Sequence, residues 1–422
     1  AASDGVKKGD LLLFPVDDFS EDVIDTAIVE PDTVPAETDS VVAAPAKKPA
    51  IAVLLPFGLD KAEPSRLNKL SLDFYKGMLL GTDNQASQPG HIDIVVRDID
   101  GKTTDQLRQL IASDSTLITA SVIIGPEDDA SLKAIAEAAA DNGTYVLNML
   151  NVRDTSYTVN PFMLQGNAPQ RTMYRQAVDG LTTDYPGYTP VILRNNAGKN
   201  EKESFTAYLT ERYRALGVEP VTISYDTNLL MADLETLPAE AGQKYVFVPS
   251  SGSLNEFNHF AYVLKSYRDK LNALASEALD TAAENGETAV YATAEVFGYP
   301  DWTAFRGDAM DLLHRLNATV YSRFFDDFNG YSSKNISADF KHWYGAPIIE
   351  SIPSYGLLGY DSATFLIRNI RANNGIFDPL FPRTFSGIQS AYDFSRDGEG
   401  FVNSSIYIIN YQSGGRVSAR VQ

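Results

Sequence analysis

Two hydrophobic patterns alternate along the chain from residue 51 onward. Short unbroken apolar runs, such as residues 51–56, are typical of strands that are buried on both faces of a sheet. Between these runs lie segments such as 67–86, whose apolar residues recur at the spacing of an amphipathic helix. The alternation occurs over 51–165 and starts again over 168–292. We therefore predict two successive α/β units, each with a mainly parallel central sheet.

The last third of the chain has a mixed pattern. Helices are predicted at 309–316, 336–343 and 361–373, and a strand at 319–324. The end of the chain is predicted to form antiparallel strands at 389–394, 405–411 and 416–421, joined by Gly-containing turns. The last strand of the second α/β unit is predicted at 289–292.

The first 49 residues differ from the rest. From Asp17 to Pro49 the chain is acidic, rich in Pro, Ala, Val and Thr, and without lasting periodicity. Such a segment buries too little apolar surface to offset its ordering entropy, so we predict a linker. The alternative is an ordered arm that docks on the body. Residues 5–15 resemble the last strand of a LysM peptidoglycan-binding module, although an unrelated apolar patch has the same appearance.

Composition excludes several classes of function. The 422 residues carry 55 acidic and 35 basic side chains, and a net charge of −20 disfavours nucleic acid as a partner. The absence of Cys excludes disulfides, thiolate zinc sites and Cys nucleophiles. No two of the four His are close enough for a short metal motif, and no apolar run reaches the roughly 18 residues of a membrane span. Residues 1–50, with 11 acids and 4 bases, hold −7 of the charge.

A search for catalytic motifs is negative. The sequence has no G-x-S-x-G elbow, no Walker loop, no H-E-x-x-H and no G-x-G-x-x-G after a predicted strand. We therefore predict a protein that is not an enzyme, with no cofactor, no catalytic residues and no metal site.

Small polar residues gather in the turns that follow the predicted strands. In open parallel sheets, ligands bind beyond the carboxyl ends of the strands, where free backbone N–H groups favour polar and anionic groups. For any single residue, helix capping is the alternative explanation. The turns of both units contain such residues, and they include Ser131, Asn148, Asn167, Asn195, Ser250 and Ser251.

Six phrases resemble the type I periplasmic solute-binding proteins of the leucine/isoleucine/valine-binding kind. They are a first strand ending in Pro, an aromatic-x-Gly helix, a strand ending in Gly-Pro, an acidic–aromatic segment, a Gly-Tyr-Asp helix start and a closing Gly-aliphatic-Gln stretch. Their positions are 51–57, 72–80, 122–126, 295–302, 359–363 and 387–390. The chain is most similar to the branch found downstream of LysM modules in bacterial envelope proteins.

This resemblance implies two Rossmann-like lobes with parallel central sheets, joined by three crossovers. Lobe one is expected to comprise 50–166 plus 299–385, and lobe two 167–298 plus 386–422. The lobes of this family close around a ligand by a hinge motion. The resemblance also implies a location in the periplasm or cell envelope, with the missing N-terminus as a possible anchor point.

The resemblance further suggests which residues line the ligand cleft. In lobe one, Ser131 and the turn from Asn148 to Asn151 match the positions that hold a ligand carboxylate, and Phe57 and Asn167 are further candidates. In lobe two, the matching positions are Asn195, Ser250, Ser251 and Glu295, with Glu295 as partner for an ammonium group. A solvated surface carboxylate is the alternative for Glu295.

The chain departs from the family at these same positions. Asn195-Asn196 and Ser250-Ser251 stand where the amino-acid binders carry Tyr, and residues 127–129 place three carboxylates where a carboxylate ligand needs donors. The resemblance therefore supports the family's fold for this chain, but not the family's specificity for amino acids.

Two functions remain open on the sequence. The first is a non-catalytic envelope protein that closes its lobes around a small polar ligand, either amino-acid-like or derived from the cell wall. The second is a protein–protein interaction module of the envelope, such as a regulator of peptidoglycan synthesis, that no longer binds a small ligand. Expected partners are the small ligand and peptidoglycan or an envelope protein, without nucleic acid and without a membrane span in this chain.

Overall fold

The computed structural model describes residues 45–422, except 239–241, 287, 289–291, 328–329 and 382–383. Most of the predicted linker, including the LysM-like segment at 5–15, lies outside the described residues. The body begins slightly earlier than residue 50, because the first strand already starts at Lys48.

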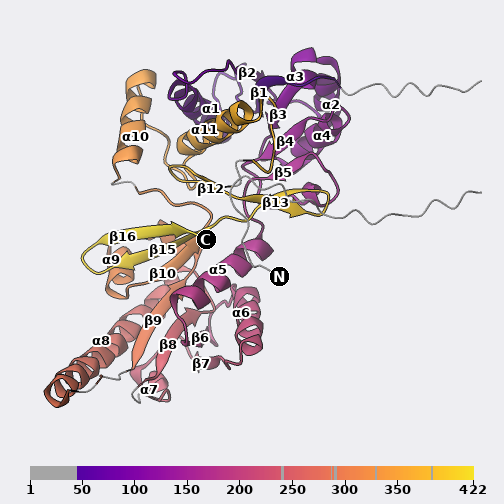
Figure 1. The fold of residues 1–422 in the computed structure, drawn as a ribbon. Helices are drawn as coiled ribbons and strands as arrows, with labels where there is room; N and C mark the ends of the chain where they lie inside the picture. The colour runs from indigo at the N-terminus through magenta and orange to yellow at the C-terminus, as the bar shows by residue number, and fades with distance from the viewer. Residues whose placement is uncertain (1–44, 239–241, 287, 289–291, 328–329, 382–383) are drawn as a thin grey trace, which may run out of the picture. The chain divides into compact units, whose positions relative to one another are not determined.

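The first lobe is built on a seven-stranded sheet with the order β13-β14-β5-β4-β3-β1-β2 (Figure 1). All neighbouring strands are parallel except β13, which pairs antiparallel to β14. The strands are β1 (Lys48–Leu55), β2 (Asp93–Asp98), β3 (Ala120–Ile124), β4 (Tyr145–Asn148), β5 (Met163–Gln165), β13 (Phe394–Asp397) and β14 (Gly400–Asn403). Its other elements are α1 (Arg66–Asp83), α2 (Thr104–Ser113), α3 (Ser115–Thr119), α4 (Asp129–Ala140), η1 (Ser156–Thr158), α10 (Tyr331–Tyr344), α11 (Tyr355–Ala372), β11 (Phe385–Ser386) and β12 (Ala391–Tyr392).

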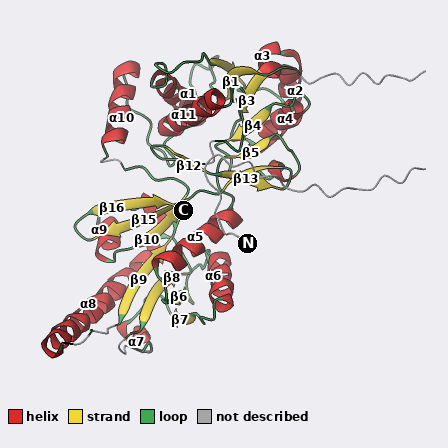
Figure 2. Ribbon diagram, in the orientation of Figure 1, coloured by secondary structure: helices red, strands yellow, loops and turns green. Residues whose placement is uncertain are grey.

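Strand β1 is buried on both faces, as its unbroken apolar run predicts. Val53 and Leu55 join the core under α1 and α11, whereas Leu54 joins the core under α2 and α4. Figure 2 shows these two pairs of helices on either side of the strands. Helices α1 and α11 approach so closely that a Cβ on Gly77 would lie 1.8 Å from a carbonyl oxygen of the facing helix. Glycine at this position is what permits the contact.

The second lobe contains another seven-stranded sheet, with the order β16-β15-β10-β9-β8-β6-β7. Strands β6 to β10 are parallel, and β15 and β16 form an antiparallel pair beside β10. The strands are β6 (Thr189–Asn195), β7 (Val221–Tyr225), β8 (Lys244–Pro249), β9 (Thr293–Gly298), β10 (Thr319–Ser322), β15 (Tyr407–Gln412) and β16 (Arg416–Val421). The helices are α5 (Gln170–Asp184), α6 (Glu203–Ala215), α7 (Met231–Leu234), α8 (Leu254–Asn285), η2 (Pro300–Ala304) and α9 (Asp308–Arg315).

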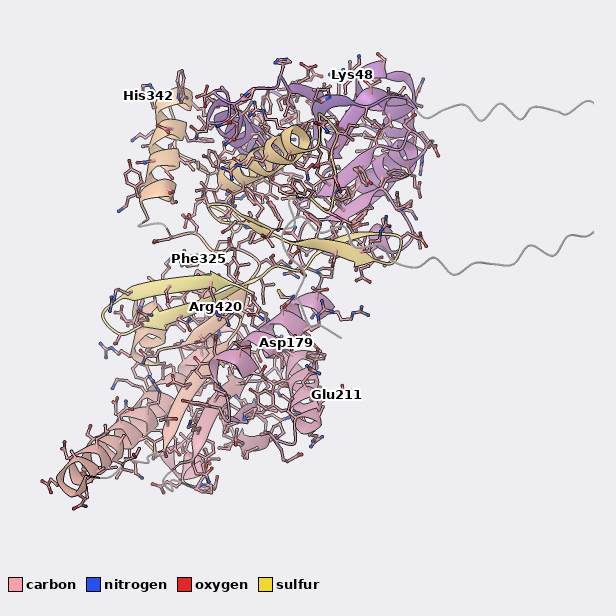
Figure 3. The ribbon with its side chains drawn as sticks, in the orientation of Figure 1. Lys48, Asp179, Glu211, Phe325, His342 and Arg420 are labelled. Atoms are coloured by element: carbon pink, nitrogen blue, oxygen red, sulfur yellow. The ribbon has the colours of Figure 1, made fainter. Side chains whose placement is uncertain are left out.

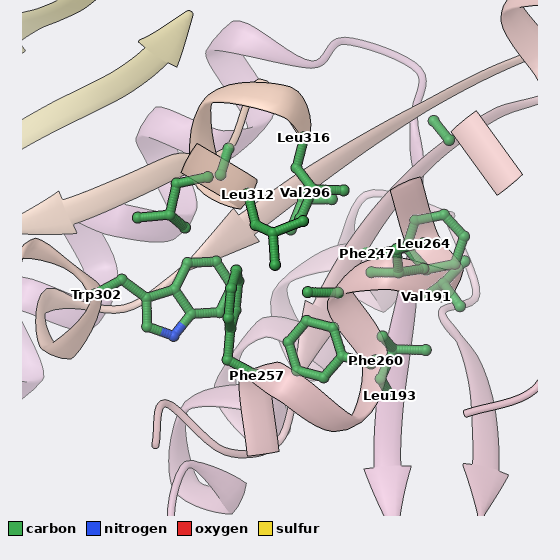
Figure 4. Close-up of a cluster of buried hydrophobic side chains, with 14 of the residues drawn as sticks. Val191, Leu193, Phe247, Phe257, Phe260, Leu264, Val296, Trp302, Leu312 and Leu316 are labelled. Carbon is green, nitrogen blue, oxygen red and sulfur yellow. The ribbon is translucent and has the colours of Figure 1, made fainter. Parts of the chain in front are cut away.

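An aromatic cluster fills one face of this second sheet. Figure 4 shows Trp302 beside Phe257 and Phe260. Trp302 is fully buried, and its ring centroid lies 5.0 to 6.3 Å from those of Phe257, Phe260 and Phe305. Helices α8 and α9 cover this face, and α5 and α6 cover the other. None of the described helices combines the length and the apolar character that a bilayer span requires.

The chain passes between the two sheets three times, after β5, after β10 and after β14, as predicted. Hydrogen bonds tie the three connections together. The guanidinium of Arg323 donates to the carbonyl of Ala168 (2.8 Å), and the amide of Asn403 donates to the carbonyl of Gly166 (2.9 Å). Phe325, labelled in Figure 3, lies in the second connection, where its ring packs against Tyr407.

The predicted lobe boundaries need two corrections. Strand β10 belongs to the second sheet, where it pairs with β9 and β15, so lobe two does not end at residue 298. Strands β13 and β14 belong to the first sheet, where β14 pairs with β5, so lobe one extends past residue 385. Strand β10 follows β9 through the short helix α9, as one more βαβ unit of the second sheet. The partner of β14 is remote in sequence, and the local apolar pattern does not specify which sheet such a strand joins.

Candidate functional site

The strand order locates one candidate ligand site in each lobe. In lobe one the order of the parallel strands reverses between β1 and β3, because α1 and α4 lie on opposite faces of the sheet. In lobe two it reverses between β6 and β8, where α6 and α8 diverge in the same way. Ligands of open α/β sheets bind beyond the carboxyl ends of the strands at this switch point. Most of the predicted site residues lie in or next to these turns.

The turn after β1 is held by a carboxylate of the protein itself. Asp98 at the end of β2 accepts hydrogen bonds from the backbone N–H groups of Phe57 (2.9 Å), Gly58 (3.3 Å), Leu59 (2.9 Å) and Asp100 (2.9 Å). Burial alone would raise the pKa of Asp98, but these donors together lower it below its ordinary value. The ring of Phe57 packs on Tyr75 in the lobe-one core, so the structure places this candidate inside the core.

The turn after β3 is also closed by its own carboxylates. Asp128 caps α4 by accepting the backbone N–H of Ser131 (2.8 Å). Glu127 accepts the hydroxyl proton of Tyr355 (3.0 Å), and Asp129 accepts the amide of Asn151. The backbone donor of Ser131, predicted to hold a ligand carboxylate, is therefore already in use.

The other lobe-one candidates form a buried hydrogen-bond network. The amide of Asn148 donates to the carbonyl of Asn151 (2.7 Å) and to Gln165 Oε1 (2.6 Å), and its oxygen accepts the backbone N–H of Asn151 (2.8 Å). Asn167 donates to the carbonyl of Met149 (2.6 Å). These side chains fix the conformation of the turn after β4.

In lobe two, the two serines connect the turn after β8 to the segment that follows β6. Ser250 Oγ donates to Asn200 Oδ1 (2.5 Å), and Ser251 Oγ donates to Glu201 Oε1 (2.8 Å). The same Glu201 oxygen accepts the backbone N–H of Gly252 (2.8 Å). The predicted residues Ser250 and Ser251 thus hold the two switch-point turns together.

Asn195, at the carboxyl end of β6, positions a buried carboxylate. Its amide nitrogen lies 2.9 and 3.1 Å from the two carboxylate oxygens of Glu256, and the hydroxyl of Tyr225 donates to the same carboxylate. The side-chain oxygen of Asn195 accepts the backbone N–H groups of Ala197 (2.9 Å) and Thr227 (3.2 Å). Glu256 is only 5% exposed, yet its hydrogen-bonding side chains are neutral.

A cavity of about 370 Å³ opens beside this carboxylate. His259 Nδ1 lies 3.6 Å from Glu256 Oε2 and has no hydrogen-bond partner within the described part of the chain. Three segments supply the lining, which consists of Asn195, Ala197, Gly198, Lys199, Thr227, Ser253, Asn255, Glu256 and His259. Of these residues the sequence predicted only Asn195. A Ser followed three residues later by a Glu, as at Ser253 and Glu256, is the usual signature of a helix start, so this spacing alone does not indicate a ligand site.

Glu295 is not at the strand end where it was predicted. It lies inside β9, where it pairs with Val246 of β8. The carboxyl end of β8 is three residues further on, at Pro249, which pairs with Leu193 of β6. At about 3.3 Å per residue, Glu295 lies roughly 16 Å along the strands from Asn195. The strand predicted at 289–292 ended too early, and residues 289–291 of it lie outside the described part of the chain.

The surroundings of Glu295 are those of a structural ion pair. Arg268 Nη2 lies 3.3 Å from its carboxylate, and the same guanidinium donates to the carbonyls of Ala294 (2.6 Å) and Arg315 (3.2 Å). Burial raises the pKa of Glu295, and Arg268 opposes this shift. The structure therefore separates Glu295 from the other lobe-two candidates.

No protein-family model matches the sequence, and no curated protein matches it. Among solved structures, the chain is similar to a protein assigned as a branched-chain amino acid ABC transporter from Rhodospirillum rubrum. The TM-score is 0.58 at 12% identity, over 89% of this chain and 100% of the other. An ABC-type branched-chain amino acid transporter from Rhodopseudomonas palustris gives 0.50 at 12% identity, over 88% and 96%. This likeness confirms the predicted fold, which is the two-lobe α/β fold of the periplasmic binding proteins.

Proposed function

We propose that this protein is a non-catalytic binding protein for a small polar ligand. The observation that carries the proposal is the cavity at the lobe-two switch point, which brings Asn195, Glu256 and His259 together. Its volume of about 370 Å³ falls within the range typical of small-molecule sites. A buried polar group is costly unless it has a hydrogen-bond partner, and among the described residues His259 Nδ1 has none. A ligand in the cavity could supply that partner.

The fold supports the same proposal. Proteins of similar structure are assigned to branched-chain amino acid ABC transporters, which need a component that captures solute. Three connections between two lobes are suited to hinge closure, which would bring the turns of lobe one onto a ligand held by lobe two. The periplasm or cell envelope is the location that fits this role. Association with peptidoglycan, a LysM module or an N-terminal anchor remains a prediction from the sequence.

Two observations favour binding over the other functions considered. The hydroxyl of Ser253 caps α8 by accepting the N–H of Glu256 (3.2 Å), which engages the serine of the cavity in a structural role. A protein-interaction module that had lost its ligand would have no use for a polar cavity with a buried carboxylate. We therefore prefer the binding protein to an enzyme or an interaction module.

A thermal-shift screen with an occluded cavity tests this proposal. The panel would contain amino acids, amines, sugars and muropeptides. Ala197→Trp should fill the cavity mouth, and Ala215→Trp, at the exposed end of α6, is the matched control. We expect at least one compound to raise the melting temperature of the wild type and of Ala215→Trp, but not of Ala197→Trp. A panel without any shift, or an equal shift in all three proteins, would contradict the proposal.

A further inference from the structure

We propose that the ligand of this site carries no carboxylate or phosphate, and is instead a neutral or cationic amine or polyol. This inference rests on the proposed function and narrows its ligand class. Two observations support it. Carboxylates of the protein itself already accept the backbone N–H groups around the two switch points, and the carboxylate of Glu256 lies beside the lobe-two cavity.

Backbone N–H groups at strand ends and helix starts are the usual binding places for anionic ligands in α/β folds. In this protein, its own carboxylates take those donors. Asp98 holds the N–H groups of the turn after β1, and Asp128 holds the N–H of Ser131 at the start of α4. An anionic ligand would have to displace these side chains and would meet their charge at short range.

The same arrangement recurs beside the cavity. Glu201 accepts both the backbone N–H of Gly252 and the hydroxyl of Ser251, directly before α8. The N–H of Glu256 is taken by the hydroxyl of Ser253, which is the cap of that helix. In three of the four switch-point turns, those after β1, β3 and β8, a carboxylate of the protein therefore accepts backbone N–H groups.

The charge beside the cavity favours donors on the ligand. Glu256 is the buried charge, and its partners Asn195 and Tyr225 are neutral. A buried carboxylate acts on a ligand more strongly than an exposed ammonium does, because water and salt screen the exposed group. Lys199 lines the mouth but is exposed, so its attraction for an anion is the weaker of the two effects.

A second acidic position at this edge is already neutralised. Asp301, just beyond the end of β9, pairs with the ammonium of Lys202 at 2.7 Å, and that ammonium lies over the ring of Tyr299 at 5.3 Å. The protein thus supplies its own cation to Asp301. Within the cavity lining, Glu256 supplies the carboxylate that can receive a hydroxyl or ammonium group of a ligand.

Matched pairs of compounds test the inference directly. Leucinamide and leucine differ in the carboxylate, and glucosamine and glucosamine 6-phosphate differ in the phosphate. The affinities are measured by isothermal titration of the wild type at low salt and neutral pH. In any pair of which a member binds, we expect the member without the anionic group to bind at least tenfold more tightly than the anionic member. Equal or tighter binding of the anionic member would overturn the inference while leaving the proposed function intact. If no member of the pairs and no member of the thermal-shift panel binds, both are overturned.

Two variants assign the preference to particular groups. Glu256→Gln should reduce the preference to less than threefold, whereas the control Glu203→Gln, at an exposed residue of α6 paired with Arg194, should leave it unchanged. Glu201→Ala frees the N–H of Gly252 and should improve binding of the anionic member at least fivefold. This second variant tests the inference even if Glu256→Gln fails to fold. An unchanged preference in Glu201→Ala, or in a folded Glu256→Gln, would overturn the assignment.

Discussion

The two switch points of this protein have the same topology but different surroundings. In lobe one, Asp98 and Asp128 bind the backbone donors of the turns, and Glu127 binds Tyr355. In lobe two, Asn195 holds Glu256 at the side of a cavity of about 370 Å³. Internal hydrogen bonds also hold the turns of lobe two, so the difference shows that the same strand order can support turns with or without a cavity beside them. We therefore assign ligand recognition mainly to lobe two.

The largest effect is expected from Asn195→Ala in lobe two. This change removes the amide donor to Glu256 and the acceptor for two backbone N–H groups, leaving a buried carboxylate poorly compensated. We expect a loss of about 3 to 4 kcal/mol in the free energy of unfolding, measured in urea. The control Asn196→Ala removes one exposed hydrogen bond to Asp226 and should cost under about 0.5 kcal/mol. Equal losses in the two variants would show that the cavity wall does not depend on Asn195.

A pH-dependent effect is expected from Asp361 in lobe one. Burial raises its pKa to about 6 from an ordinary 3.8, although three backbone N–H groups of residues 388–390 oppose the shift. The folded protein therefore holds this proton more tightly than the unfolded chain does. The resulting stabilisation is complete below pH 3.8 and is lost as the pH rises through 6, by roughly 2 to 3 kcal/mol. Asp361→Asn should flatten the stability profile over this range, and an unchanged slope would argue against the assignment.

Asp98 should give the opposite pH dependence. Since its pKa is lowered, its stabilisation is present above pH 3.8 and is lost as the pH falls through the lower folded value. Asp98→Ala should cost about 2 kcal/mol at neutral pH, because several backbone donors lose their acceptor. Asp93→Ala, at an exposed position of the same strand, is the control and should change stability little. The assignment would be contradicted if the difference in the free energy of unfolding between the wild type and Asp98→Ala became larger below pH 4.

The smallest effect is expected from Glu295→Gln. This residue lies within β9, where burial of its carboxylate outweighs the attraction of Arg268, so the neutral side chain should cost at most about 1 kcal/mol. It should alter the affinity for a cavity ligand by less than twofold in isothermal titration. A tenfold loss of affinity would restore Glu295 as a ligand-binding residue.

The sequence predicts the fold well because its signals are local. The unbroken apolar run of β1 and the polar residues that end β6 and β8 mark strands and turns without reference to the rest of the chain. The sheet membership of β14 could not be predicted, since its partner β5 is distant in sequence.

The site was predicted less completely for the same physical reason. Asn195 is the last residue of β6, and a polar residue at the carboxyl end of a strand by itself indicates a place where a ligand can bind. Glu256 and His259 acquire their role only when the first turns of α8 meet Asn195 and Thr227. The misplacement of Glu295 has a local cause, because the predicted strand ended before β9 begins.

A crystal structure of the complex with a ligand identified in the thermal-shift screen tests the central claim most directly. We expect the ligand in the lobe-two cavity, with a hydroxyl or ammonium group within about 3.2 Å of the Glu256 carboxylate. A ligand bound away from Glu256, Asn255 and His259, or bound through an anionic group at these residues, would contradict the claim.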